Sequence, residues 1–133
     1  MIVYNKTICK NKKIAIFGAG TAGKNLISFA NKTSKIKVIF DNNQKLIGES
    51  LMGIPIAHPS AIHEYDFDYI VIASRFEKDI FEQLSVNLEI PNSKILYSPF
   101  VLNNNLEKFL FLVRNFDLFF LLLFLITILL CTQ

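Results

Sequence analysis

Cysteine and histidine are scarce in this chain of 133 residues, which contains two of each. Cys9 and Cys131 stand at opposite ends of the sequence, one beside lysines and one in an apolar run, so neither a disulfide nor a metal site is expected from them. His58 and His63 are five residues apart and have no cysteine near them, which argues against a zinc site. The sequence therefore predicts no bound metal. Cysteines that form no disulfide are typical of proteins in a reducing compartment.

Several motifs that mark enzymes or exported proteins are also missing. Ser60 lacks the Gly-x-Ser-x-Gly surroundings of a hydrolase nucleophile and fits a helix cap better. There is no Tyr-x-x-x-Lys pair of the short-chain reductase type, and the residues up to Lys13 lack the apolar core of a secretory signal. We expect a cytoplasmic domain without a complete catalytic set of its own.

Charge is unevenly spread along the chain, and the net charge is +3. Nearly all charged residues up to Lys45 are lysines, whereas acids dominate from Glu49 to Glu107. The lysines could attract an anionic ligand or a membrane surface, or they could simply form a solvated face. They are scattered and have no aromatic residues interleaved, so we expect no binding to nucleic acid.

Short apolar runs recur over the first hundred residues. Three runs of branched and aromatic residues predict buried parallel strands at residues 14–17, 37–40 and 69–73. A last strand is expected within residues 93–98. Each run is too short, and too closely flanked by turn residues, to be a helix.

Two helices are expected between these strands. The first begins in a glycine turn and ends near Lys32. The second covers residues 75–88, and its apolar residues fall on one helical face, namely Phe76, Ile80, Phe81 and Leu84. Strands that alternate with helices predict a small three-layer α/β domain around a parallel sheet.

The stretch from Gly18 to Asn25 reads GAGTAGKN and permits two interpretations. The spacing of Gly18, Gly20 and Gly23 is that of the dinucleotide fingerprint, while Gly18 with Gly23 and Lys24 comes within one residue of a triphosphate-binding loop. A triphosphate loop needs a Ser or Thr hydroxyl for Mg²⁺ where Asn25 stands, and an amide is a poor magnesium ligand. The dinucleotide interpretation is therefore favoured, with a phosphate bound by the amides at the helix start.

Further candidate residues follow the other two predicted strands. Asp41 comes about twenty residues after the glycines, where an acid accepts hydrogen bonds from ribose hydroxyls; a solvated strand end is the alternative. Ser74 and Arg75 follow the third strand, so Arg75 could meet a phosphate or could be a surface arginine. The glycines could also serve only a tight turn. The predicted binding residues are Gly18, Gly20, Thr21, Ala22, Gly23, Asp41, Ser74 and Arg75.

These motifs resemble those of a known group of domains. The resemblance covers about residues 12–98 and rests on the strings IAIFGAGTAGKNL, KVIFDNNQKLIG, GIPIAHPSAI, DYIVIAS and KIL. They are similar to the small Rossmann-like nucleotide-binding module at one end of bacterial polysaccharide-biosynthesis proteins, such as capsule-type nucleotide-sugar dehydratases and epimerases and sugar acetyl- and methyltransferases. The resemblance implies that Gly18, Gly20, Gly23 and Asp41 bind NAD(P) or a nucleotide-sugar, and that the chemistry is carried elsewhere.

The last part of the chain has a different composition. Residues 118–131 contain no charge, glycine or proline, so we expect a nucleotide-binding domain at residues 1–102 and a hydrophobic helical tail at residues 103–133. Fourteen helical residues measure about 21 Å, short of a hydrocarbon core of about 30 Å. We expect residues 106–131 to be helical and to contact a membrane or a catalytic subunit.

Two functions stay open on these grounds. The first is a nucleotide- or nucleotide-sugar-binding module of envelope polysaccharide synthesis, attached through its tail to the inner face of the cytoplasmic membrane. The second is a truncated or split fragment of a nucleotide-sugar modifying enzyme, which would need a separately encoded catalytic subunit.

Overall fold

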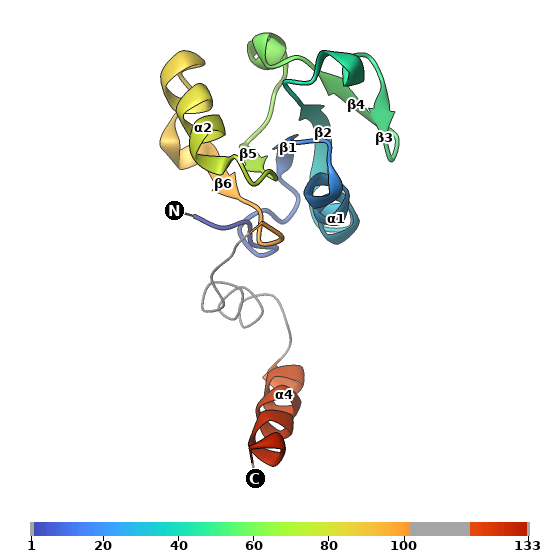
Figure 1. The fold of residues 1–133 in the computed structure, drawn as a ribbon, viewed down its shortest axis with the longest axis vertical. Helices are drawn as coiled ribbons and strands as arrows, with labels where there is room; N and C mark the ends of the chain where they lie inside the picture. Colours follow the sequence, from blue (N-terminus) through green and yellow to red (C-terminus); the bar gives the residue numbers. More distant parts are fainter. Residues whose placement is uncertain (1, 102–117, 133) are drawn as a thin grey trace.

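The computed structural model describes residues 2–101 and 118–132, and the first of these parts folds around a six-stranded sheet. The strand order is β3-β4-β2-β1-β5-β6 (Figure 1). The elements in chain order are β1 Lys13–Phe17, α1 Thr21–Ala30, β2 Lys35–Phe40, η1 Gln44–Leu46, β3 Ser50–Leu51, β4 Ile54–Ala57, η2 Pro59–Glu64, β5 Tyr69–Ile72, α2 Glu77–Glu82, η3 Gln83–Asn87, η4 Asn92–Lys94, β6 Ile95–Tyr97 and α4 Leu118–Cys131. The segments η1, η2 and η4 are 3₁₀ turns, and η3 is a π-helical turn.

The carboxyl ends of β1, β2 and β5 lie side by side. Phe17 at the end of β1 pairs in parallel with Phe40 of β2 and with Ile72 of β5. The three predicted strands are therefore confirmed close to their expected positions. Because the strands are parallel and in register, the loops that follow them meet at one edge of the sheet.

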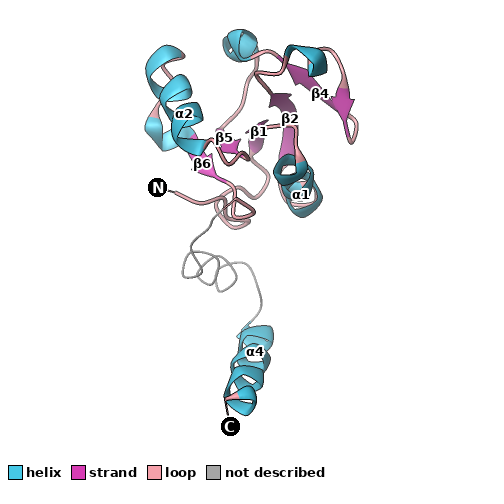
Figure 2. Ribbon diagram, in the orientation of Figure 1, coloured by secondary structure: helices cyan, strands magenta, loops and turns pink. Residues whose placement is uncertain are grey.

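Side chains of the sheet point alternately to two cores, as the pleat requires. Ile14 and Ile16 pack with α1 in one core, whereas Ala15 and Phe17 pack with α2 in the other. Figure 2 shows the two helices on opposite sides of the sheet. Burying each large apolar side chain stabilises the fold by about 1.5–3 kcal/mol. The predicted three-layer α/β architecture is confirmed.

The sheet differs from the prediction at one edge, where β3 runs antiparallel to β4. Met52 and Gly53 join the two strands, and both have positive φ angles, 52° and 81°. A two-residue loop with two positive φ angles matches the right-handed twist of adjacent strands and forms a tight hairpin. The predicted parallel sheet therefore carries one antiparallel strand, β3, at this edge.

Two local predictions are also corrected. The sequence places Phe76 on the apolar face of the second helix, but α2 begins only at Glu77 and Phe76 is 58% exposed. The sequence also predicts Ser60 as the cap of a short helix within residues 58–65. The cap is His58, whose ring nitrogen Nδ1 accepts a hydrogen bond of 3.1 Å from the backbone N–H of Ser60.

The N-terminal segment extends the sheet beside β6. Val3 forms a parallel bridge with Tyr97, and the N–H of Tyr4 donates to the carbonyl of Tyr97 at 2.8 Å. Tyr4 is fully buried, and its hydroxyl lies 2.8 Å from the hydroxyl of Ser34, which donates to the carbonyl of Cys9 at 2.8 Å. This network holds residues 3–9 against β6 and against the turn that follows α1.

The hydrophobic tail contains the helix α4, which confirms the helical prediction for residues 118–131. The remainder of that prediction, residues 106–117, lies outside the described residues. From residue 122 onward the described side chains of α4 are exposed. The hydroxyl of Thr127 donates to the carbonyl of Leu123 at 2.8 Å, so it is satisfied within the helix. In the described part of the chain, no helix is long and apolar enough to span a bilayer.

Candidate functional site

A crevice of about 370 Å³ opens at the edge of the sheet where β1, β2 and β5 end. The strand ends form one side of the crevice and α2 forms the other. Open parallel α/β sheets bind ligands at this edge, outside the carboxyl ends of their strands. The crevice is therefore the candidate site. Its lining residues are Phe17, Gly18, Asp41, Asn42, Ser74, Phe76, Asp79, Ile80 and Gln83.

The predicted site residues divide into two groups. Gly18, Asp41 and Ser74 line the crevice, although the first and the last are 56 positions apart in the sequence. Gly20 is the N-cap of α1, and residues Thr21 to Gly23 form the first turn of that helix. No side chain caps this helix start, so the first-turn amides are left for another acceptor.

Two glycines of the fingerprint are required by the packing of the protein itself. Gly18 has a φ of +119°, and a Cβ at this position would collide with the carbonyl oxygen of Ala73 after β5. A Cβ at Gly23 would collide with the carbonyl oxygen of Gly18. The two residues therefore let β1, β5 and α1 approach one another closely.

Gly20 has no such requirement. Its φ of −84° is open to any residue, and a Cβ added there would have no atom of the described residues within 4 Å. Ser, Thr, Asp and Asn are equal or better N-caps than glycine, so capping does not demand glycine either. The absence of a side chain at Gly20 leaves open space in front of the first turn of α1.

The carboxylate of Asp41 is held by two backbone groups. One oxygen, Oδ2, accepts a hydrogen bond of 2.9 Å from the N–H of Ala19, and the other, Oδ1, accepts one of 2.8 Å from the N–H of Asn43. The first bond ties the end of β2 to the glycine turn. A carboxylate can accept about four hydrogen bonds, so Asp41 keeps acceptor capacity toward the crevice.

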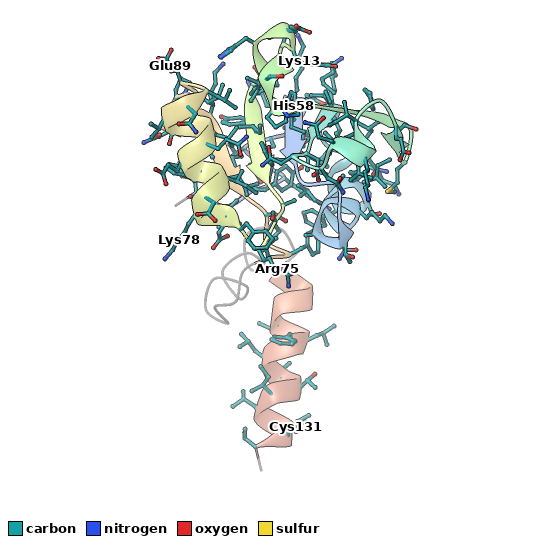
Figure 3. The ribbon with its side chains drawn as sticks, turned by 45° about the horizontal axis from the view of Figure 1, so that its top comes forward. Lys13, His58, Arg75, Lys78, Glu89 and Cys131 are labelled. Atoms are coloured by element: carbon teal, nitrogen blue, oxygen red, sulfur yellow. The ribbon has the colours of Figure 1, made fainter. Side chains whose placement is uncertain are left out.

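Ser74 and Arg75 follow β5 at the same edge. The hydroxyl of Ser74 accepts a hydrogen bond of 3.2 Å from the N–H of Phe76 and so shapes the start of α2. The guanidinium of Arg75 lies 5.3 Å from the centre of the Phe76 ring, a cation–π distance. Figure 3 shows Arg75 at the end of the domain opposite Lys13. Its neighbours Ser74 and Phe76 line the crevice, whereas Arg75 does not.

Sequence reasoning missed the side of the crevice that α2 forms. Phe76, Asp79, Ile80 and Gln83 follow the i, i+3, i+4, i+7 spacing of one helical face, and that spacing was the available signal. Asp79 adds a second carboxylate to that of Asp41, so the charged residues lining the crevice are both acidic. Across the described ranges, no group of three or more His, Cys, Asp or Glu residues could hold a metal ion.

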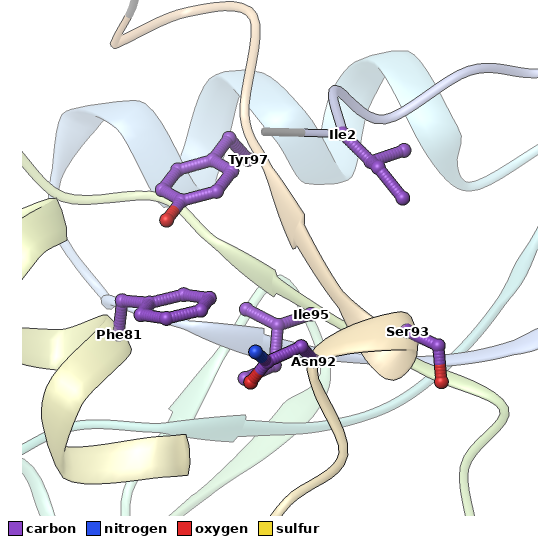
Figure 4. Close-up of a pocket in the computed structure, with 6 residues that line it drawn as sticks. All are labelled: Ile2, Phe81, Asn92, Ser93, Ile95 and Tyr97. Carbon is purple, nitrogen blue, oxygen red and sulfur yellow. The ribbon is translucent and has the colours of Figure 1, made fainter. Parts of the chain in front are cut away.

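A second cavity lies at the β6 edge of the sheet (Figure 4). It measures about 350 Å³, and the rings of Phe81 and Tyr97 stack across it with their centroids 6.0 Å apart. Burial, with a smaller contribution from Glu77, raises the pKa of Tyr97. None of the predicted binding residues lines this cavity, so it is separate from the candidate site.

Comparison with known proteins supports the fold. The family model described as C2185-like, N-terminal, matches residues 10–96. The solved UDP-D-quinovosamine 4-dehydrogenase from Vibrio fischeri aligns with a TM-score of 0.53 at 22% identity, over 65% of this chain and 77% of that one. This likeness confirms a Rossmann-like α/β fold.

Other solved structures align less closely. RSP, a Rex-family repressor, has a TM-score of 0.49 at 20% identity, over 78% of this chain and 57% of that one. The complex of RSP with beta-NADH gives a TM-score of 0.48 at 21% identity, over 78% of this chain and 58% of that one. No curated protein sequence matches this chain significantly.

Proposed function

The chain belongs to the C2185-like, N-terminal family, and we propose that it is a nucleotide-binding domain whose ligand is NAD(P) or a nucleotide-sugar. The ligand occupies the crevice at the ends of β1, β2 and β5. In this proposal the domain binds and positions the nucleotide, and the residues that carry out chemistry belong to another domain or subunit.

The observation that carries the proposal is the contrast among the three glycines. Packing explains the lack of a side chain at Gly18 and Gly23, but it does not explain the lack of one at Gly20. A phosphate that approaches the backbone at the start of α1 would explain it, because a Cβ there would occupy the phosphate's place. The N–H groups of the first turn and the positive end of the helix supply the attraction.

The other residues of the site suit the remainder of a nucleotide. Asp41 has acceptor capacity left for sugar hydroxyls, which are hydrogen-bond donors. The side chains of Phe17, Phe76 and Ile80 give the crevice apolar surface of the kind on which a flat base can pack. Arg75 directly follows Ser74, which lines the crevice together with Gly18, and it is our candidate for a phosphate contact.

We place this binding function in cell-envelope polysaccharide biosynthesis. Support comes from the resemblance of the chain's motifs to modules of polysaccharide-biosynthesis proteins. The Vibrio fischeri neighbour is, by its name, a UDP-sugar dehydrogenase, and we extend a nucleotide-sugar ligand to this chain only as part of the proposal.

Titration of the full-length protein, kept in detergent, with NAD⁺, NADP⁺ and UDP-N-acetylglucosamine tests the proposal. At least one of these ligands should bind, and Gly20→Val should lower its affinity by roughly 100-fold or more, because the side chain occupies the phosphate's place. Gly20→Ala should weaken binding less. Calorimetry measures affinity. The melting temperature without ligand should fall by only a few degrees in both variants, because alanine and valine are poorer N-caps than glycine but meet no neighbouring atom.

Two outcomes contradict the proposal. If wild-type protein binds none of the three ligands, the nucleotide-binding function is wrong. If a ligand binds equally well to Gly20→Val, the ligand does not approach the glycine turn, and the site lies elsewhere.

A further inference from the structure

Asn42 and Gln83 join the two sides of the crevice through their side-chain amides. The Asn42 Nδ2 donates to Gln83 Oε1 at 3.0 Å, and the Gln83 Nε2 donates to Asn42 Oδ1 at 3.0 Å. The residues are 41 positions apart, and both line the crevice. Asn42 directly follows Asp41 at the end of β2, while Gln83 directly follows α2.

A local irregularity of the helix accompanies this pair. The regular turns of α2 end at Glu82, and Gln83 begins the π-helical turn η3. The N–H of Leu88 donates to the carbonyl of Gln83 at 3.0 Å, an i to i+5 bond. Turns of this kind occur where helices end. The π-turn therefore belongs to the end of the helix, and Gln83 lies where α2 gives way to it.

The pair keeps unused hydrogen-bonding capacity. Each amide has two N–H donors and a carbonyl oxygen with two lone pairs, and the reciprocal bonds use one of each. One donor and one acceptor therefore remain on Asn42 and on Gln83. A side-chain amide can bind a nucleobase edge that presents an adjacent donor and acceptor, as it does with N6 and N7 of adenine.

The position of the pair fits a base rather than a phosphate. Asp41, the proposed acceptor for sugar hydroxyls, is the immediate neighbour of Asn42, and consecutive Cα atoms are about 3.8 Å apart. Gln83 is the first residue of η3, three positions after Ile80 of α2, and both residues line the crevice. The amides are uncharged and the nearby carboxylates of Asp41 and Asp79 repel anions. A flat, uncharged base suits these surroundings.

We propose that Asn42 and Gln83 are specificity-determining residues that bind the base of the nucleotide by hydrogen bonds to its edge. The inference rests on the proposed nucleotide-binding function. The shared chemistry is an edge with adjacent donor and acceptor groups, which adenine of NAD and uracil of a UDP-sugar both present. Binding exchanges the bonds between the two amides for bonds to the base.

Calorimetric titration of full-length protein in detergent with NAD⁺ and with UDP-N-acetylglucosamine tests this inference and distinguishes the two bases. Asn42→Ala and Gln83→Met each remove one amide, and methionine keeps most of the glutamine's length. Each variant should raise the Kd of the ligand that wild-type protein binds by roughly three- to tenfold, as expected for loss of a hydrogen bond. Asn87→Ala, which removes an exposed amide from the same turn η3, is the control and should leave Kd unchanged.

The possible results separate the inference from the proposed function. Raised Kd values in both variants, with melting temperatures of the free proteins near that of wild type, support base recognition. Unchanged or lower Kd values overturn it and identify the amide pair as a structural tie between β2 and α2. Failure of wild-type protein to bind any of NAD⁺, NADP⁺ and UDP-N-acetylglucosamine overturns the proposed function and this inference with it.

Discussion

At the scale of single residues, Tyr4 and Cys9 show how buried polar groups are tolerated in this small core. Both side chains are completely buried, and burial raises the pKa of the Tyr4 hydroxyl and of the Cys9 thiol. Each group therefore stays protonated in the folded protein to a higher pH than in the unfolded chain. The Tyr4 hydroxyl also keeps a partner in Ser34, so its burial does not leave an unsatisfied donor.

These raised pKa values predict a loss of stability in alkaline solution. Above about pH 9 the thiol and then the phenol ionise in the unfolded chain before they do so in the folded protein. The unfolded state then binds fewer protons, and the free energy of unfolding falls as the pH rises. Chemical denaturation at several pH values from 7 to 10 should show this fall. The decrease in the free energy of unfolding should be smaller in Cys9→Ala. A free energy of unfolding that rises between pH 7 and pH 10 would contradict the prediction.

At the scale of elements, the glycine turn joins β1, α1 and β5. Gly18 packs closely against the carbonyl of Ala73 after β5, and Gly23 of α1 packs closely against the carbonyl of Gly18. Asp41 adds a hydrogen bond from the end of β2 to Ala19 of the same turn. The turn therefore positions the start of α1 against three strands, and its geometry belongs to the fold as much as to the site.

Alanine substitutions should separate these roles. Gly18→Ala and Gly23→Ala should each destabilise the protein by about 1–3 kcal/mol, because the added methyl group collides with backbone and, at residue 18, the φ angle is strained. Gly20→Ala should change stability by less than about 0.5 kcal/mol. Denaturant unfolding measures all three. Equal destabilisation at the three positions would show that packing also requires a glycine at residue 20.

At the scale of the whole molecule, α4 differs from the other helices by having no polar face. Its 14 residues include no charged side chain, and Thr127 bonds to the backbone of the helix itself. A helix packed on one side against a domain needs a polar face toward water. Burial of such a helix in lipid is favoured at about 25 cal/mol per Å² of apolar surface.

We expect the full-length protein to associate with membranes through this helix. Ile126→Lys combined with Leu129→Lys should release it, because a lysine near the centre of an inserted helix costs about 2.5–3.5 kcal/mol. Leu129→Met, which stays apolar, is the matched control. Fractionation followed by carbonate and detergent extraction provides the measurement. A wild-type chain that is monodisperse without detergent would show that α4 is covered by protein instead.

The sequence alone determined the elements whose signal is local. Continuous apolar runs predicted β1, β2 and β5, and helical spacing after the glycines predicted α1, because burial on both faces of a sheet or on one face of a helix dictates the residues directly. The glycine spacing and the acid at residue 41 predicted which edge of the sheet would carry the site. A local signal also predicted a helix over residues 106–131, of which the structure describes residues 118–131 as α4.

Only the tertiary structure decided the features that depend on residues far apart in the chain. Phe76 is exposed and α2 begins at Glu77, two residues later than predicted. The side chain of Gln83 bonds to that of Asn42, 41 positions away. The positions of β5 and α1 also decide that Gly18 and Gly23 pack against backbone atoms while Gly20 does not. No sequence pattern encodes such contacts separately, because they arise only when parallel strands bring distant loops to one edge of the sheet.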